Sequence, residues 1–176
     1  MAETDPMLSS QKTITPDIGL EEADLNGVNV LLSKALGSVY TLGAKTKKYH
    51  WNITGQEFQQ LHELFDEQYS ILQTIVDDIA EYIRSYGAMS PGTLEEFQQL
   101  SVIEEKAGYN PPAFEMVADL VADYEQLMRM FREHSQLAVN EYNDVQAEDL
   151  YIGFMHTLSK QAWFLRSHLE NQGKNV

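Results

Sequence analysis

The residues best suited to chemistry are two histidines and three acids, in a chain without cysteine: His50, His62, Asp66, Asp77 and Glu81. Imidazole together with carboxylate is the ligand set of iron, manganese or zinc, rather than of copper(I) or an iron–sulfur cluster. The intervals from His62 to Asp66 and from Asp77 to Glu81 are both four residues. On a helix each pair therefore lies on one face, within reach of a common ion.

The longer interval between these two pairs limits how they can share a metal. Asp66 and Asp77 are eleven residues apart, or roughly 16 Å along a helix at about 1.5 Å per residue. Neither a single ion nor two ions about 3.5–4 Å apart can span that distance. At about 100° per residue, however, all four positions stay on one face of the helix.

Two arrangements are compatible with this spacing. Either one chain carries two half-sites, or a second copy lies antiparallel and brings its Asp77 and Glu81 against His62 and Asp66 of the first. The second arrangement gives each site five ligands and places it on a twofold axis, and it is our working hypothesis. A strictly monomeric protein that bound metal tightly at these residues would contradict it.

A single acid or histidine on a helix is usually only a solvated or hydrogen-bonded side chain. Here five such residues share one stripe, and their neighbours are apolar: Leu61, Phe65, Leu72, Ile75, Val76 and Ile79. Charges beside an apolar stripe are costly unless they are paired or bound to metal. We therefore interpret the five residues together as a metal site.

The composition indicates one globular domain, and the lack of cysteine is compatible with a reducing compartment. A chain of 176 residues with 43% hydrophobic residues is long enough to form one core without covalent or metal cross-links. The absence of cysteine excludes disulfides and thiolate metal sites. The first residues lack the basic and apolar regions of a signal peptide, and no apolar run has the length of a membrane span. We expect a cytoplasmic protein without a membrane partner.

The net charge of −15 bears on the partners of the protein. Nucleic acids are bound largely through Lys and Arg, so this charge argues against DNA. An acidic surface concentrates cations in its clefts, which agrees with a metal site. The alternative is that the acidic residues serve only solubility.

Apolar residues recur every three or four positions, which predicts four long helices and almost no strand. The first extends from about 20 to 49 and the second to about 86, the third follows Asn110-Pro111, and the fourth follows the polar stretch 140–147 and ends before Gly173. A link of roughly 25 residues between the second and third helices would let them run parallel. We expect a bundle domain at 18–172, a flexible acidic tail at 1–17 and a short tail at 173–176.

Two sequences have the form of a capping box, in which a threonine and a glutamate three residues later satisfy the free amides of a helix start. Thr54 and Glu57 would open the second long helix, and Thr93 and Glu96 would open a short extra helix through Leu100. The proline after Asn110 would be the first residue of the third long helix. The polar stretch 140–147 contains Asp144, a candidate N-cap of the fourth.

The central motif resembles that of the Dps miniferritins (DNA-binding proteins from starved cells), a family of ferritin-like four-helix bundles. It consists of His50-Trp51-Asn52-Ile53-x-Gly55-x-x-Phe58-x-x-Leu61-His62-x-x-Phe65-Asp66-Glu67, followed by Asp77-Asp78-Ile79-Ala80-Glu81. The short crossover helix and the ending Trp163-Phe164-Leu165-Arg166-x-His168-Leu169-Glu170 are also similar to this family, so that the resemblance covers about 20–171. The Glu-x-x-His signature of the large ferritins is absent.

The resemblance implies a homododecameric shell with a di-iron ferroxidase centre at each twofold interface. His50, His62 and Asp66 of one subunit would face Asp77 and Glu81 of its neighbour, and all five positions match the family. Fe(II) would be oxidised, with hydrogen peroxide preferred over oxygen, and Fe(III) would be mineralised inside the shell. This implies iron storage and protection against oxidative stress, with zinc as a candidate competitor for the same ligands.

Further residues have roles that only the resemblance implies. Trp51 matches a tryptophan beside the centre that absorbs stray oxidising equivalents, and the alternative is a buried anchor at a helix end. Glu63 and Glu67 match acids at which mineral nucleates, although a solvated acidic face would have the same pattern. We interpret the remaining histidines of the bundle, none of which has a ligand partner at helical spacing, as structural: His134, His156 and His168.

Asp144 and Asp149 match acids that line the threefold pores through which iron enters the shell. The next acid expected on that face is replaced by Gly153. The pore would then be a weaker funnel for cations, or Glu148 would complete it. Asp144 could alternatively serve only as the helix cap.

Two other functions compete with the ferroxidase. A DNA-compacting protein is disfavoured, because the N-terminal tail carries Glu3, Asp5 and Asp17 against Lys12, and the C-terminal end offers only Lys174. A gel shift at low salt tests this expectation. The second rival is an inert interaction bundle whose carboxylates only keep it soluble, and anaerobic Fe(II) titration distinguishes it from the enzyme.

Overall fold

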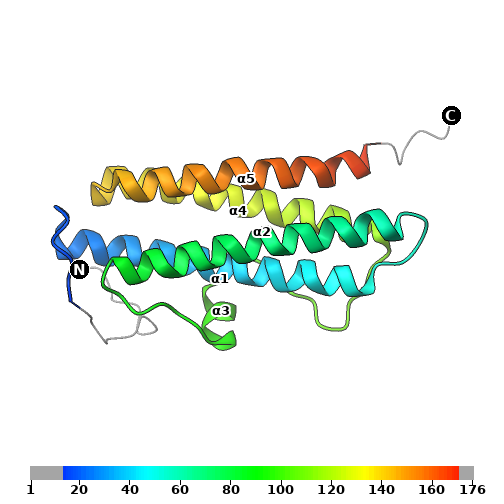
Figure 1. Ribbon diagram of the computed structural model, residues 1–176, viewed down its shortest axis with the longest axis horizontal. Helices are drawn as coiled ribbons and strands as arrows, with labels where there is room; N and C mark the ends of the chain where they lie inside the picture. The colour runs from blue at the N-terminus through cyan, green and yellow to red at the C-terminus, as the bar shows by residue number, and fades with distance from the viewer. Residues whose placement is uncertain (1–13, 171–176) are drawn as a thin grey trace.

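The computed structural model describes residues 14–170, and within them all regular secondary structure is helical. Of the five helices in these residues, the four long ones form a bundle and the short one lies outside it (Figure 1). The helices are α1 (Glu22–Asn52), α2 (Phe58–Ser85), α3 (Leu94–Leu100), α4 (Ala113–Tyr142) and α5 (Val145–Leu169). The predicted N-terminal tail overlaps the described part only at residues 14–17, and the predicted C-terminal tail at 173–176 lies outside it.

The topology is that of two antiparallel pairs joined by a crossover. α1 packs on α2 and α4 packs on α5, while α1 also contacts α4 and α3. α2 and α4 run in the same direction, because residues 86–112 return along the outside of the bundle between them (Figure 1). This confirms the predicted four-helix bundle with a short helix in a long crossover.

The core consists of the apolar stripes of the four long helices. Its largest fully buried side chains include aromatic residues from all four of them: Tyr49, Phe65, Tyr124, Phe131 and Tyr151. Burying one such side chain contributes about 1.5–3 kcal/mol. None of the described helices has the length and hydropathy that crossing a membrane requires.

The short helix α3 begins with the predicted capping box. The Glu96 amide donates to the Thr93 hydroxyl at 3.2 Å, and the Thr93 amide donates to the Glu96 carboxylate at 2.8 Å. α3 approaches α1 closely at Gly37, where an added Cβ would lie 2.8 Å from the Cβ of Leu100. A glycine is needed at this contact, since real Cβ atoms do not approach one another so closely.

The predicted starts of two long helices were wrong. α2 begins at Phe58, and its N-cap Glu57 makes no side-chain cap hydrogen bond, so the capping box expected with Thr54 does not form. The chain turns there instead, through Gly55 at φ +110°. α4 begins at Ala113 rather than Pro111, because a residue that precedes a proline is sterically excluded from the helical conformation.

The ends of α1 and α4 also extend beyond the predicted limits. α1 continues through Asn52 instead of ending near residue 49. α4 continues through Tyr142, so that the polar stretch 140–147 is not a loop. The link to α5 is only Asn143, at φ 55°, and Asp144. Asparagine tolerates this left-handed conformation, and aspartate caps the next helix, so two residues are sufficient.

Candidate metal centre

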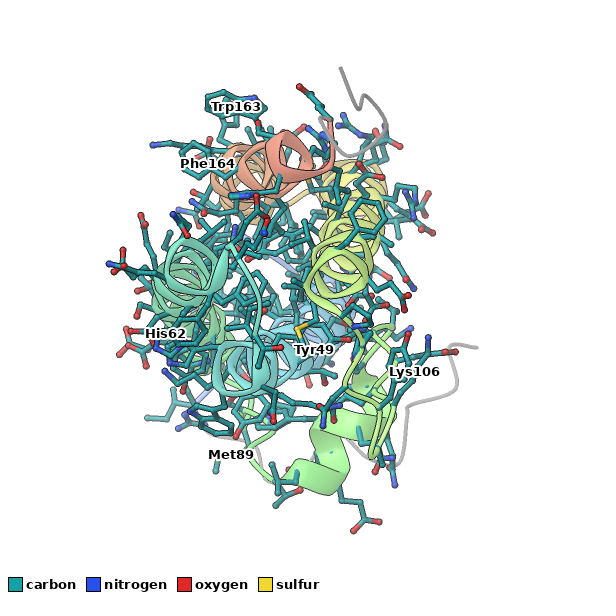
Figure 2. All side chains as sticks on the ribbon, turned by 90° about the vertical axis from the view of Figure 1, so that its right-hand side faces the viewer. Tyr49, His62, Met89, Lys106, Trp163 and Phe164 are labelled. Carbon is teal, nitrogen blue, oxygen red and sulfur yellow. The ribbon has the colours of Figure 1, made fainter. Side chains whose placement is uncertain are left out.

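Two histidines meet where α1 ends and α2 begins. His50 lies in the last turn of α1, and His62 lies in the second turn of α2. The turn at Gly55 returns the chain alongside α1, and the two imidazole rings stack with centroids 3.8 Å apart and planes 22° apart. Figure 2 shows His62 at the outer side of the α1–α2 pair, away from the bundle interior.

The two histidines orient each other through their backbones. Nδ1 of His50 lies 2.7 Å from the carbonyl oxygen of His62, and Nδ1 of His62 lies 2.9 Å from that of His50. Because a carbonyl oxygen can only accept, each Nδ1 carries the proton. In the neutral form of each ring the lone pair is therefore on Nε2, and this is the tautomer that a metal-binding histidine needs.

Asp66 follows His62 by one helical turn and completes a half-site with the two histidines. Its Oδ1 lies 3.9 Å from Nε2 of His50. This separation fits a metal ion between the two atoms, since metal–ligand bonds to nitrogen and oxygen are about 2.0–2.2 Å long. Residues 14–170 of one chain nevertheless contain no group of three or more acidic or histidine side chains that could hold a metal ion by itself.

The other two predicted ligands lie elsewhere on α2. Asp77 and Glu81 are exposed, and the helix separates Asp77 from Asp66 by roughly 16 Å. The structure thus brings three of the five residues together and leaves the second pair apart within the chain. The sharing of a site between two copies stays a prediction.

A lysine that the sequence analysis missed binds the carboxylate of this half-site. The Lys47 ammonium donates to Oδ1 of Asp66, and it also lies 4.9 Å from the ring centroid of Tyr69. The hydrogen bond from Lys47, together with the positive charge of its ammonium, lowers the pKa of Asp66. Three lysines within four residues of a chain with only 12 Lys and Arg were the available signal: Lys45, Lys47 and Lys48.

Two aromatic residues border the histidines. Phe58 stacks on His62 with ring centroids 5.1 Å apart, a contact that the sequence analysis also missed. Trp51 is 70% exposed. The interpretation of Trp51 as a buried anchor is therefore wrong within one chain, and its role in absorbing oxidising equivalents stays a prediction.

Glu63 and Glu67 are both exposed on α2. The Gln59 amide donates to Glu63 at 3.1 Å, one turn earlier on the same helix. Exposure agrees equally with mineral nucleation and with a solvated acidic face. The nucleating role is therefore still a prediction.

Asp144 is the N-cap of α5, as the alternative interpretation predicted. Its Oδ1 accepts from the amides of Gln146 and Ala147, both at 3.0 Å, and its Oδ2 accepts from the hydroxyl of Tyr86 at 2.7 Å. The residue is buried, and both carboxylate oxygens are bonded within the chain. This arrangement leaves Asp149, which is exposed, as the stronger candidate for guiding iron.

Asp149 borders a groove of about 470 Å³ between α2 and α5. Gly153 lies in the same groove, and open space surrounds the position that its Cβ would take. Asp78 of α2 lines the opposite side. An acid from another helix thus lines the same groove as Gly153.

The remaining histidines differ in environment. His134 is buried, and its ring packs edge-on against Tyr151 with centroids 5.5 Å apart. Burial lowers the pKa of His134 to about 4, so that the ring is neutral and structural, as predicted. His168 lies 3.8 Å from the carboxylate of Glu57, and His156 is exposed on α5.

Comparisons with known proteins agree with this architecture. The model of the ferritin-like domain family matches residues 30–173. A low temperature-induced protein of Nostoc sp., itself described as uncharacterized, is 42% identical over 156 residues, or 89% of this chain and 87% of that protein. The DNA protection during starvation protein 2 of Bacillus anthracis is 34% identical over 139 residues, or 79% of this chain and 94% of that protein.

A solved structure adds the three-dimensional likeness. The Dps protein of Vibrio cholerae is described as a member of a broad superfamily of ferritin-like diiron-carboxylate proteins, and it is 25% identical to this chain. The TM-score is 0.82, with 92% of this chain and 100% of that one covered. The matched family model, the identity to the Bacillus protein and the shared fold lead to one conclusion: this chain belongs to the ferritin-like family, among its Dps proteins.

Proposed function

We propose that this protein is a Dps-type ferroxidase, which oxidises Fe(II) with hydrogen peroxide and stores Fe(III) inside a dodecameric shell. The observation that carries the proposal is the reciprocal pairing of His50 and His62. It turns both Nε2 atoms into free ligands beside the exposed carboxylate of Asp66. Imidazole and carboxylate together are ligands that suit iron.

Each site is completed by a second copy that lies antiparallel and supplies Asp77 and Glu81. Three observations support this arrangement. The half-site of one chain has too few converging ligands to hold a metal ion by itself. The second acid pair is exposed, and among residues 14–170 it belongs to no group of ligands that could hold an ion. The exposed rings of Trp51 and Phe58 border the half-site and offer apolar surface that a second copy would cover.

Within this site the protein residues bind and orient two Fe(II) ions. Each Fe(II) gives one electron, and the pair reduces one hydrogen peroxide with two protons to two waters. Delivery of both electrons to one peroxide breaks its O–O bond without releasing a hydroxyl radical, which is how the reaction protects against oxidative stress. A paired metal site with positions open to the oxidant is what this chemistry requires.

Other residues of the chain serve the transport and storage of the product. Asp149 and Asp78, which face each other across the groove between α2 and α5, attract Fe(II) on its way into the shell. Glu63 and Glu67 are exposed carboxylates at which Fe(III) mineral begins to form. Zn(II) accepts the same imidazole and carboxylate ligands and competes with iron for the site.

Mixed assemblies of two inactive variants test the proposal most directly. We expect Asp66→Ala and Glu81→Ala each to abolish fast peroxide-driven oxidation without changing the helix content. In a shell assembled from both variants, two unlike chains form two sites. One site combines both substitutions, and the other combines the intact Asp66 of one chain with the intact Glu81 of the other. Part of the wild-type rate should therefore return, as measured by the absorbance of Fe(III) after addition of peroxide.

The matched control is a shell assembled from two differently tagged Asp66→Ala chains, in which no site is intact. Light scattering establishes that both mixtures form the same assembly. Recovery in both mixtures, or in neither, would refute the shared site. The wild-type protein is also compared with peroxide and with oxygen as sole oxidant, and a faster reaction with oxygen would contradict the proposed oxidant preference.

A further inference from the structure

Lys47 occupies the oxygen of Asp66 that a metal ion needs. Its ammonium donates to Oδ1 of Asp66, and this is the same oxygen that lies 3.9 Å from Nε2 of His50. An ion bound to His50 would therefore approach the atom that Lys47 already holds. No hydrogen bond of the described residues engages the other carboxylate oxygen of Asp66 in this way.

The ammonium and a divalent ion cannot share this oxygen without repulsion. A single and a double positive charge about 4 Å apart repel by an amount that corresponds to about thirtyfold in a binding constant in bulk water. Ionic screening reduces this effect, because Asp66 is exposed and Lys47 is half-buried rather than buried. An ion that enters the site must therefore displace Lys47 or bind more weakly.

Tyr69 provides a place for the displaced ammonium. Its ring centroid lies 4.9 Å from Nζ of Lys47, within the range of a cation–π interaction. The lysine can leave the carboxylate while it keeps this contact. A small movement of one flexible side chain is thus sufficient to exchange the ammonium for a metal ion.

We propose that Lys47 is a resident counter-ion of the iron site, which holds the metal-facing oxygen of Asp66 until Fe(II) displaces it and thereby sets the affinity for divalent ions. This inference rests on the proposed function of the same residues. With two carboxylates from a second copy, the site carries three negative charges, and Lys47 reduces them to two. One divalent ion then neutralises the site, and a further ion gives it a net positive charge.

The neighbouring lysine provides a matched control. Nζ of Lys48 donates to the backbone carbonyls of Lys106 and Tyr109, at 3.0 and 2.7 Å, in the crossover. Removing either lysine changes the charge of the chain by the same amount. Only Lys47 contacts a ligand of the site, so the two variants separate a local effect from a change in net charge.

Binding of Zn(II), which undergoes no redox reaction, tests the proposal by calorimetry on the assembled full-length protein at one fixed pH. We expect Lys47→Met to bind Zn(II) about tenfold more tightly than the wild type. Lys47→Arg, which retains the charge, and Lys48→Met should both bind as the wild type does. The gain in Lys47→Met should also shrink as salt is added, which a purely structural role of the lysine would not produce.

Unchanged or weaker binding by a correctly assembled Lys47→Met protein would overturn the proposal, as would an equal gain in Lys48→Met. Anaerobic Fe(II) titration followed by tryptophan fluorescence repeats the comparison with the substrate. The proposed function fails if the wild type binds neither ion, or if His50→Ala leaves the binding unchanged. In either case Lys47 has no site to regulate. If the wild type binds and only the gain is missing, the ferroxidase assignment stands and the role of Lys47 fails.

Discussion

Two lysines separated by one residue on α1 pair with aspartates in opposite surroundings. Lys45 is 4% exposed and contacts α4, while Lys47 lies on the outer face beside the histidines. Figure 2 shows the same contrast in their neighbours, with Tyr49 inside the bundle and His62 at its outer side. The same pair of functional groups therefore serves two different purposes within one helical turn.

The buried pair is a closed network. Nζ of Lys45 lies 2.8 Å from Asp119 and 2.6 Å from Asp123, and it donates to the carbonyl of Glu104 at 3.3 Å. The Tyr49 hydroxyl donates to Asp119 at 2.6 Å. Burial opposes the ionised forms, but the hydrogen bonds from Lys45 and Tyr49 outweigh it and lower the pKa of Asp119. The network fixes α1, α4 and the crossover to one another.

The pair of Lys47 and Asp66, by comparison, remains accessible to solvent and to ions. Asp66 keeps solvent access, and the two imidazoles beside it use Nδ1 for hydrogen bonds to backbone carbonyls, which leaves Nε2 available to a metal ion. A metal ion can replace the ammonium there because water solvates the displaced charge. The comparison teaches that burial, rather than residue type, decides whether a lysine–aspartate pair holds the fold together or stays available to a ligand.

The largest expected contrast is in iron oxidation. Asp66→Asn removes a ligand of the site, and we expect the peroxide-driven rate to fall more than about 100-fold, since loss of outer-shell partners alone commonly costs 10–100-fold. Asp119→Asn should retain most of the rate wherever the protein stays assembled. Stopped-flow absorbance of Fe(III) measures both variants. Equal losses in two folded shells would remove the functional distinction between the two pairs.

The free energy of unfolding should fall more for a variant of the buried pair than for a variant of the exposed pair. Lys45→Met leaves the buried carboxylate of Asp123 and the half-buried carboxylate of Asp119 without a counter-ion, and we expect a loss of about 3–5 kcal/mol in the free energy of unfolding. Urea denaturation at neutral pH measures it. A triple variant, Lys45→Met with Asp119→Asn and Asp123→Leu, removes the charges together and should recover most of the loss. A single variant as stable as the wild type would show that the network contributes no stability.

His134 is a buried ionisable group without a counter-ion among the described residues, and we expect it to make the stability of the protein depend on pH. The pKa of His134 is lowered by burial to about 4, below the ordinary value of 6.5, so the unfolded chain binds a proton that the folded chain does not. Stability from this residue is therefore complete above pH 6.5 and falls as the pH drops towards 4, by up to about 3 kcal/mol. Urea denaturation between pH 7 and 4 measures this slope.

His134→Phe is the matched variant for that slope, because it keeps an aromatic ring against Tyr151 and cannot be protonated. Its free energy of unfolding should depend less on pH between 6.5 and 4 than that of the wild type. Parallel curves for the two proteins would mean that folding does not lower the pKa of His134. Any slope left in the variant belongs to other groups, such as the carboxylates of the network.

The smallest expected effect is that of Lys47→Met on stability. Exposed ion pairs contribute little, because water solvates the separated charges. We expect the urea midpoint to match that of the wild type within experimental error, although the affinity for Zn(II) changes. A midpoint that falls as far as that of Lys45→Met would show that Lys47 has a structural role.

The sequence by itself determined the helices and the candidate ligands. The apolar period of three and four residues gave four long helices, and Thr93 with Glu96 gave the start of the short one, because these signals are local. The spacing of the five ligands also showed that the two acid pairs cannot meet within one straight helix. Neither conclusion depends on which helices pack together.

Helix boundaries were predicted less well, because a local signal can be overridden by its neighbours. The expected cap at Thr54 failed since Gly55 turns the chain before α2 begins, and Pro112 shifted the start of α4 by excluding Pro111 from the helix. The sequence alone is compatible with two roles for Asp144, as an acid of a pore or as the cap of a helix. Its hydrogen bonds to two amides and to Tyr86 decided for the cap.

Only the tertiary structure decided what each polar group contacts. Lys45 and Lys47 are two residues apart, so they point to nearly opposite sides of α1 at about 100° per residue. The sequence does not reveal which side faces an acid, since Asp119 comes from α4 and Asp66 from α2. Likewise, the free Nε2 atoms of His50 and His62 depend on the angle at which α2 returns along α1. Periodicity specifies which face of a helix is buried, whereas hydrogen bonds between helices depend on distances and angles that are set only when the helices pack.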